Sequence, residues 1–92
     1  MKLNPHARQF YKVEVVTDPP VAGWEASFDG GTTWDTGEDD PLLADTWRWL
    51  VAGSLADPGT SVAVVAQTTW PLVRATDNPE ILVEDAPPIF VY

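Results

Sequence analysis

Apolar and polar residues alternate with a period of two through most of the chain. In residues 10–17, Tyr11, Val13 and Val15 fall on one side of an extended backbone, with charged residues between them. A period of two is typical of a half-buried β-strand. The same alternation predicts strands at residues 24–28, 46–52, 71–76 and 80–85, the last with Ile81 and Val83 inward.

Two further segments are apolar without clear alternation. Residues 60–69 are rich in Val and Thr and carry no charge, which predicts a strand buried on both faces, as at the centre of a sheet. Residues 89–92 form a short apolar stretch after Pro87 and Pro88. No segment shows the 3.6-residue stripe of an amphipathic helix, and the best helical candidate is a single turn at 40–46.

Proline and glycine stand between the predicted strands, where they end a ladder or form a turn. About seven or eight short strands with turns between them are typical of a small sandwich or barrel. We therefore predict an all-β, single-domain β-sandwich of the immunoglobulin-like kind, or a closely related barrel. Its parts are an N-terminal arm at 1–9, the domain at 10–86, and a C-terminal strand or arm at 87–92.

The 92 residues carry a net charge of −9 and include no cysteine. A strongly acidic chain is a poor partner for nucleic acid or an anionic membrane, because both attract clustered positive charge. No apolar run approaches the ~20 residues that span a bilayer. We expect neither nucleic acid nor membrane as a partner, and we predict no cofactor.

The residues give little support to an enzyme. His6 is the one histidine, and it lies in the predicted arm, away from any strand that could orient it toward a nucleophile. Paired carboxylates occur by chance in so acidic a chain. We predict no catalytic residues.

An acidic stretch at 35–45 is the one candidate for a metal. Glu38, Asp39, Asp40 and Asp45 lie close together, and calcium prefers carboxylate oxygens. The spacing of a calcium-binding EF-hand loop is missing, so a solvated loop is favoured and no metal site is predicted. Leu42 and Leu43 within it are expected to fold back onto the core.

One local motif is sharp. Ser27, Asp29, Gly31, Thr33 and Trp34 match the pattern Ser-x-Asp-x-Gly-x-Thr-Trp and resemble the Asp-box of sialidases and related propellers. The box implies a structural hairpin rather than a catalytic element. Its aspartate would accept hydrogen bonds from the turn, its glycine would supply a positive φ, and its tryptophan would pack beneath.

The tryptophans divide into core and surface candidates. Trp24, Trp47 and Trp49 stand at alternating positions and are expected to face inward. Trp70 lies near a strand end and is a candidate for an exposed aromatic anchor at an interface. Two aromatic residues near the C-terminus, Phe90 and Tyr92, are candidates for the same interface.

A wider resemblance covers roughly half of the chain. The hairpin at 24–34, the segments 47–53 and 56–58, and residues 71–86 look like small proteins from the virion-structure modules of actinobacterial tailed phages. The resemblance implies a structural virion component, made in the host cytoplasm, that binds the major capsid protein or the portal and connector subunits. It also implies a homo-oligomer within the assembly.

Three functions stay open at this stage. The first is a capsid-bound decoration or minor capsid protein, which a rigid, acidic, proline-rich module would suit. The second is a head–tail connector protein. The third is a carbohydrate-binding module, which would need one or two tryptophans exposed on a flat face.

Overall fold

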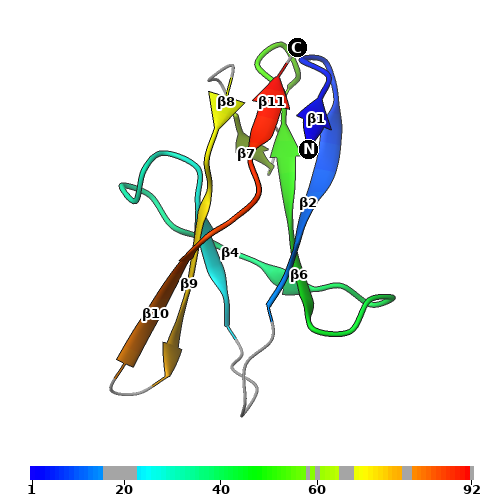
Figure 1. Ribbon diagram of the computed structural model, residues 1–92. Coiled ribbons are helices and arrows are strands. Elements are labelled where there is room, and N and C mark those ends of the chain that lie inside the picture. The colour runs from blue at the N-terminus through cyan, green and yellow to red at the C-terminus, as the bar shows by residue number, and fades with distance from the viewer. Residues whose placement is uncertain (16–22, 58, 60, 65–67, 78–79, 92) are drawn as a thin grey trace.

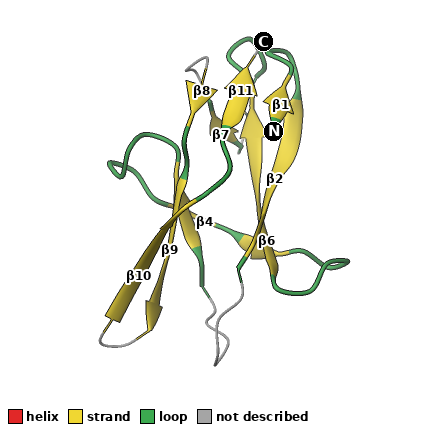
Figure 2. Ribbon diagram, in the orientation of Figure 1, coloured by secondary structure: helices red, strands yellow, loops and turns green. Residues whose placement is uncertain are grey.

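Every regular element of the described chain is a β-strand, and Figure 2 shows only strands and loops. The computed structural model describes residues 1–15, 23–57, 59, 61–64, 68–77 and 80–91 (Figure 1). The strands are β1 Lys2–Leu3, β2 Arg8–Glu14, β3 Glu25–Ser27, β4 Asp35–Thr36, β5 Glu38–Asp39, β6 Thr46–Ala52, β7 Val62–Ala63, β8 Thr68–Thr69, β9 Leu72–Asp77, β10 Glu80–Asp85 and β11 Ile89–Val91. The predicted all-β class is confirmed, and the arrangement is consistent with a small β-sandwich.

Two sheets form the body of the molecule (Figure 1). The first has the order β2-β6-β5, with β7 added parallel to β6, and the second has the order β10-β9-β3-β4. The long β2–β6 pair sets Tyr11 opposite Trp49 and Val13 opposite Trp47. In the second sheet, β3 sets Ala26 opposite Val73 of β9.

The core lies between the inward faces of these two sheets. The alternation predicted for 10–17 is confirmed as far as residue 15, because Tyr11, Val13 and Val15 are buried, and residues 16–17 lie outside the described residues. Trp24 and Trp49 are buried as expected, and Trp47 is half-buried against the same cluster. The remaining members come from both sheets and both ends of the chain: Leu3, Ala26, Val51, Val64, Val73, Ala75, Ala86 and Ile89.

The N-terminal segment, expected to be an arm, packs against the body of the fold. Strand β1 pairs in parallel with β11 in a third, small sheet of order β1-β11-β8, and Leu3 is fully buried. The terminal ammonium of Met1 donates to the carbonyl of Pro88 over 2.7 Å. Leu3 is the one fully buried side chain of the segment, and a single leucine carries no periodic pattern that a sequence could display.

Two inward predictions for β10 are wrong. Ile81 is 63% exposed and Val83 is 54% exposed. The register sets Leu82 opposite the buried Ala75, so the alternate residues of β10 turn to the outer face of the sheet. Alternation fixes which residues share a face, but the partner strand decides which face is inside.

The stretch 40–46 has no helical turn: residues 41–45 form bends and a turn, Thr46 begins β6, and Leu42 and Leu43 are exposed. The Asp40 carboxylate accepts hydrogen bonds from the backbone N–H groups of both leucines, at 2.9 and 3.2 Å. An aspartate that bonds the backbone two and three residues on favours a turn over a helix.

The uncharged stretch 60–69 is not one central strand. The structure has β7 and β8 in two different sheets, with Ala63 and Thr68 exposed. Residues 60 and 65–67 lie outside the described residues.

Candidate functional site

The Asp-box residues form a tightly bonded hairpin turn between β3 and β4. The Asp29 carboxylate accepts hydrogen bonds from the Ser27 hydroxyl (2.8 Å) and from the N–H groups of Thr32 (3.1 Å) and Thr33 (2.8 Å). The N–H of Gly31 donates to the Ser27 hydroxyl over 2.8 Å. Gly31 has a φ of +97°, which a side chain would strain.

Trp34 closes this turn from the side. Its indole N–H donates to the carbonyl of Gly31 over 3.1 Å. The Arg74 guanidinium stacks on the indole ring, 4.0 Å from its centre, and its Nε lies 3.1 Å from a Glu25 carboxylate oxygen. These contacts lie within the fold, and they support the hairpin turn that the motif predicts.

The charge of the turn depends on these bonds. The backbone N–H of Thr33, the Ser27 hydroxyl and the other donors hold the pKa of Asp29 below its ordinary value. Asp35, next to the turn, behaves in the opposite way. Burial, and secondarily the charge of Asp29, raises the pKa of Asp35.

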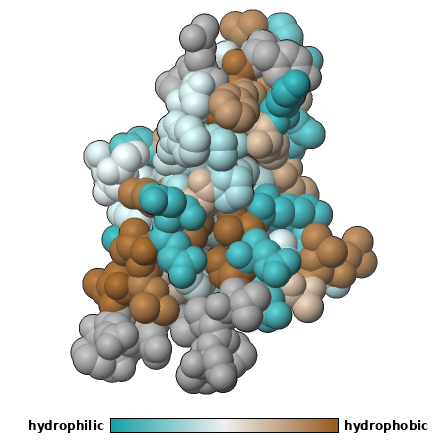
Figure 3. Space-filling view, viewed as in Figure 1, coloured by the Kyte–Doolittle hydropathy of each residue, from teal (hydrophilic) through white to brown (hydrophobic). Residues whose placement is uncertain are grey.

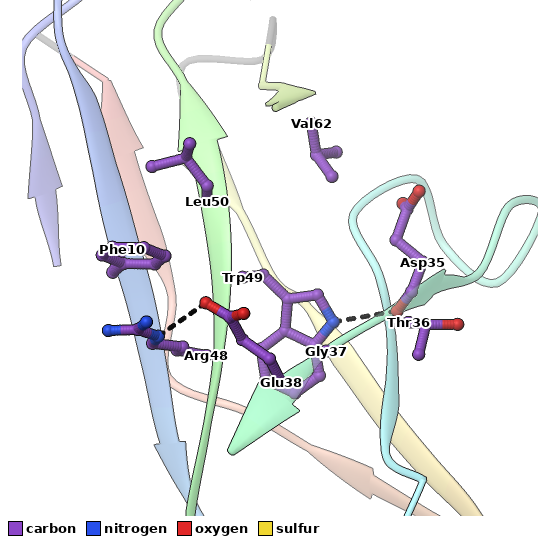
Figure 4. A pocket seen from close by; sticks show the side chains of 9 residues that line it. All are labelled: Phe10, Asp35, Thr36, Gly37, Glu38, Arg48, Trp49, Leu50 and Val62. Carbon is purple, nitrogen blue, oxygen red and sulfur yellow. Dashed lines mark hydrogen bonds and ion pairs between the residues drawn. The ribbon is translucent and has the colours of Figure 1, made fainter. Parts of the chain in front are cut away.

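A groove of about 480 Å³ opens beside β6 (Figure 4). Strand β5 pairs with the first part of β6, and β7 pairs with its last two residues, Val51 and Ala52. Trp49 and Leu50 lie between these pairings, and the groove occupies the interval. Nine residues line it: Phe10, Asp35, Thr36, Gly37, Glu38, Arg48, Trp49, Leu50 and Val62.

Three contacts link residues that line the groove. Arg48 stacks on the Phe10 ring at 4.0 Å and donates from its Nε to Glu38 at 2.7 Å. The Trp49 indole N–H donates to the carbonyl of Asp35 over 2.8 Å (Figure 4). The groove therefore combines an apolar wall with the Arg48–Glu38 ion pair and the side chains of Asp35 and Thr36, which is suited to a side chain of a partner.

A second exposed surface is the outward face of the small sheet β1-β11-β8. Trp70 is 66% exposed and Phe90 is 43% exposed, while the residues between them in the alternation, Thr69 and Ile89, are buried. Phe90 lies opposite Thr68, and Trp70 follows directly after the end of β8. We call Trp70 and Phe90 the aromatic face.

The predicted interface residues thus have different outcomes. Trp70 and Phe90 are both exposed, one directly after β8 and the other in its partner β11, and Tyr92 lies outside the described residues. The groove residues Phe10 and Arg48 were not expected. Phe10 lies on the exposed side of β2, together with polar residues. An aromatic residue at such a position is the sequence feature that could have indicated a binding surface.

The residues considered for catalysis or metal binding make separate local contacts. The backbone N–H of the exposed His6 donates to the side chain of Asn4. The Asp40 carboxylate meets Lys12 Nζ at 2.8 Å, and this contact, the Leu42 N–H and other donors lower the pKa of Asp40. Within the described parts of the chain, no group of three or more metal-ligating side chains gathers.

Comparison with known proteins adds no relationship. The chain has no significant match among protein-family models, curated proteins or solved structures. None of the described residues belongs to a helix long and apolar enough to cross a membrane.

Proposed function

We propose that this chain is a non-enzymatic structural component of a tailed-phage virion, bound to the capsid as a decoration or minor capsid protein. The observation that carries the proposal is the aromatic face. Phe90 is exposed on the sheet that joins the two ends of the described chain, and Trp70 is exposed directly after β8 of that sheet. The likeness of the sequence to virion-module proteins supports the same role.

Exposed aromatic side chains of this size favour a partner. Burial of a large apolar side chain stabilises a complex by about 1.5–3 kcal/mol, and tryptophan is enriched among residues that dominate binding. Lys2 lies opposite Phe90 and supplies a cation at the rim of the face. A capsid subunit with an apolar depression would cover both rings.

The acidic surface suits a protein that must stay apart before assembly. A net charge of −9 makes copies of the chain repel each other in solution. Attachment to a shell overcomes this repulsion only through specific contacts. The proposal therefore includes copies ordered by the capsid, with homo-oligomeric contacts confined to the assembly.

Co-sedimentation with capsids of the encoding phage tests the role of the aromatic face. Trp70→Ser and Phe90→Ser, each expected to keep the melting temperature, should each lower capsid binding about tenfold or more. Leu42→Ser is the control, because Leu42 is also exposed, at 88%, but lies between β5 and β6 of the first sheet. Equal binding by all three variants would contradict this placement of the interface.

A head–tail connector is the alternative within the same class, and a single ring of copies at the portal vertex would favour it. A carbohydrate-binding module is the second candidate, because the exposed indole of Trp70 could stack on a sugar ring. Calorimetric titration with host cell-wall oligosaccharides decides this candidate. If the unmodified chain releases heat on binding the oligosaccharide and Trp70→Ser does not, the carbohydrate-binding function would replace the capsid proposal.

A further inference from the structure

Strand β10 is a six-residue edge. In the described part of the chain it pairs only with β9, and it ends the order β10-β9-β3-β4. The β9–β10 pair extends to the lower left in Figure 1, away from the small sheet. The edge is therefore accessible to another chain.

The outer face of β10 is hydrophobic. Ile81 and Val83 are more than half exposed, and Figure 3 shows hydrophobic side chains gathered where Figure 1 places β10. Edge strands commonly carry a charge at such positions to prevent pairing with other chains. The other long edge strand, β2, has Arg8 and Lys12, but β10 has no cation.

The backbone of β10 is poised for a new neighbour. Antiparallel ladders alternate between hydrogen-bonded and non-hydrogen-bonded pairs. The Ala86 N–H donates to the Pro71 carbonyl over 2.9 Å, and these two residues are the next pair after Asp85 and Leu72 in the register, so this pair is a bonded one. By the alternation, the N–H and C=O groups of Ile81 and Val83 point away from β9, toward the free edge.

Charge selects the kind of neighbour. Glu84 and Asp85 are exposed at the end of β10. The nearest cation across the ladder, Arg74, is engaged by Glu25 and Trp34. A second copy of the chain would bring another net charge of −9 to this edge. A basic strand would gain attraction instead of repulsion.

We infer that β10 is a docking edge for an extended, basic segment of a partner protein, which adds to the sheet as a further strand. Apolar side chains of the segment would lie beside Ile81 and Val83, and its alternate lysine or arginine side chains would lie on the opposite face, beside Glu84. The inference goes beyond the virion role and stands on β10 alone, so its test requires no virion.

The test uses the full chain and a capped peptide of about eight residues that alternates lysine and valine. We expect saturable binding with amide NMR shifts centred on residues 80–85, and binding at least about tenfold weaker for the peptide alternating glutamate and valine. Equal binding of the two peptides, or shifts centred on another sheet, would overturn the inference.

Three variants test the mechanism. Val83→Pro removes an edge N–H that the β9 ladder does not use, and it should weaken binding about tenfold or more. Val83→Ser keeps that N–H and removes the apolar contact, so it should also weaken binding. This variant provides the test if Val83→Pro fails to fold. Glu84→Lys should weaken binding severalfold, whereas Glu14→Lys on β2 makes the same charge change elsewhere and should not.

Sedimentation of the chain without peptide tests whether a second copy of the chain, instead of a basic partner, occupies the β10 edge. We expect no dimer that depends on β10. If the unmodified chain is a dimer and Val83→Pro is a monomer, the edge binds a second copy of the chain. This result would overturn the inference of a basic partner.

Discussion

Single residues in the 27–34 hairpin determine how the chain turns between β3 and β4. Asp29 gathers hydrogen bonds from three residues, and Gly31 adopts a φ of +97° beside Trp34 and Leu72. The sequence predicted this motif because each of these contacts and the positive φ require one residue type at one position. This local chemistry, unlike the packing of the hairpin on β9, requires no knowledge of distant segments.

Gly31→Val is expected to destabilise the fold by about 2 kcal/mol, because a β-branched residue is strained at this φ. A loss of this size lowers the Tm by roughly 10 °C in a chain of this length. Glu38→Ala removes one exposed ion pair with Arg48 and should cost less than about 1 kcal/mol. Thermal unfolding measures both, and equal Tm shifts would contradict the turn geometry.

The two carboxylates with lowered pKa, Asp29 and Asp40, link stability to acid. Each contributes stability that is present above its ordinary pKa and is lost as the pH falls through its lowered value in the folded chain. Protonation of Asp35, whose pKa is raised, opposes this loss in part. We expect the Tm to fall as the pH drops below about 4.

Asp29→Asn tests this linkage. The variant should be less stable than the unmodified chain at pH 7. It should also lose less stability between pH 7 and acid, because one carboxylate with a lowered pKa has been removed. Asp39→Asn removes an equal charge from an exposed position on β5 and is the control. An unchanged acid dependence in Asp29→Asn would show that the hairpin bonds do not set the stability of the folded state.

At the scale of elements, the N-terminal strand depends on one close approach. A Cβ at Gly53 would lie 2.5 Å from the carbonyl oxygens of Asn4 and Pro5. The Gly53 N–H donates to Ala7, and the Leu55 N–H donates to Pro5. These contacts hold the 1–9 segment against the end of β6.

Gly53→Ala should therefore displace the N-terminal segment and cost about 2 kcal/mol. Hydrogen exchange should rise at the amides of Leu55 and Phe90, whose acceptors are Pro5 and Met1. Gly23→Ala adds strain at a positive φ where no atom lies within 4 Å, and it should leave both amides protected. Unchanged protection in Gly53→Ala would mean that the segment is held by other contacts.

Sequence patterns predicted most elements but not all of their faces. The predicted strands 24–28, 46–52, 71–76 and 80–85, and the described part of 10–17, correspond to observed strands, because side-chain alternation is a local property. The orientation of β10 depends on Ala75 across the ladder, and the burial of Leu3 depends on β11, far away in sequence. Such pairings, like the gap beside β6 that forms the groove, arise only when distant strands meet.

The whole molecule combines a buried core with several exposed hydrophobic groups. The aromatic face, the outer side of β10 and the leucines of the 40–46 loop lie in different parts of the structure, and Figure 3 shows the last two in one view. More than one apolar surface on an acidic module is expected of a protein that contacts several neighbours. The proposed place in a virion accounts for this distribution, since a shell offers neighbours on more than one side.

The copy number of this chain in purified virions of the encoding phage tests the central claim most directly. Quantitative mass spectrometry against the major capsid protein measures it. A capsid-bound protein should occur in a fixed ratio to the capsid subunits, with many copies on each face of the shell. A count sufficient for only one ring would favour the connector, and absence from the particle would contradict the virion role altogether.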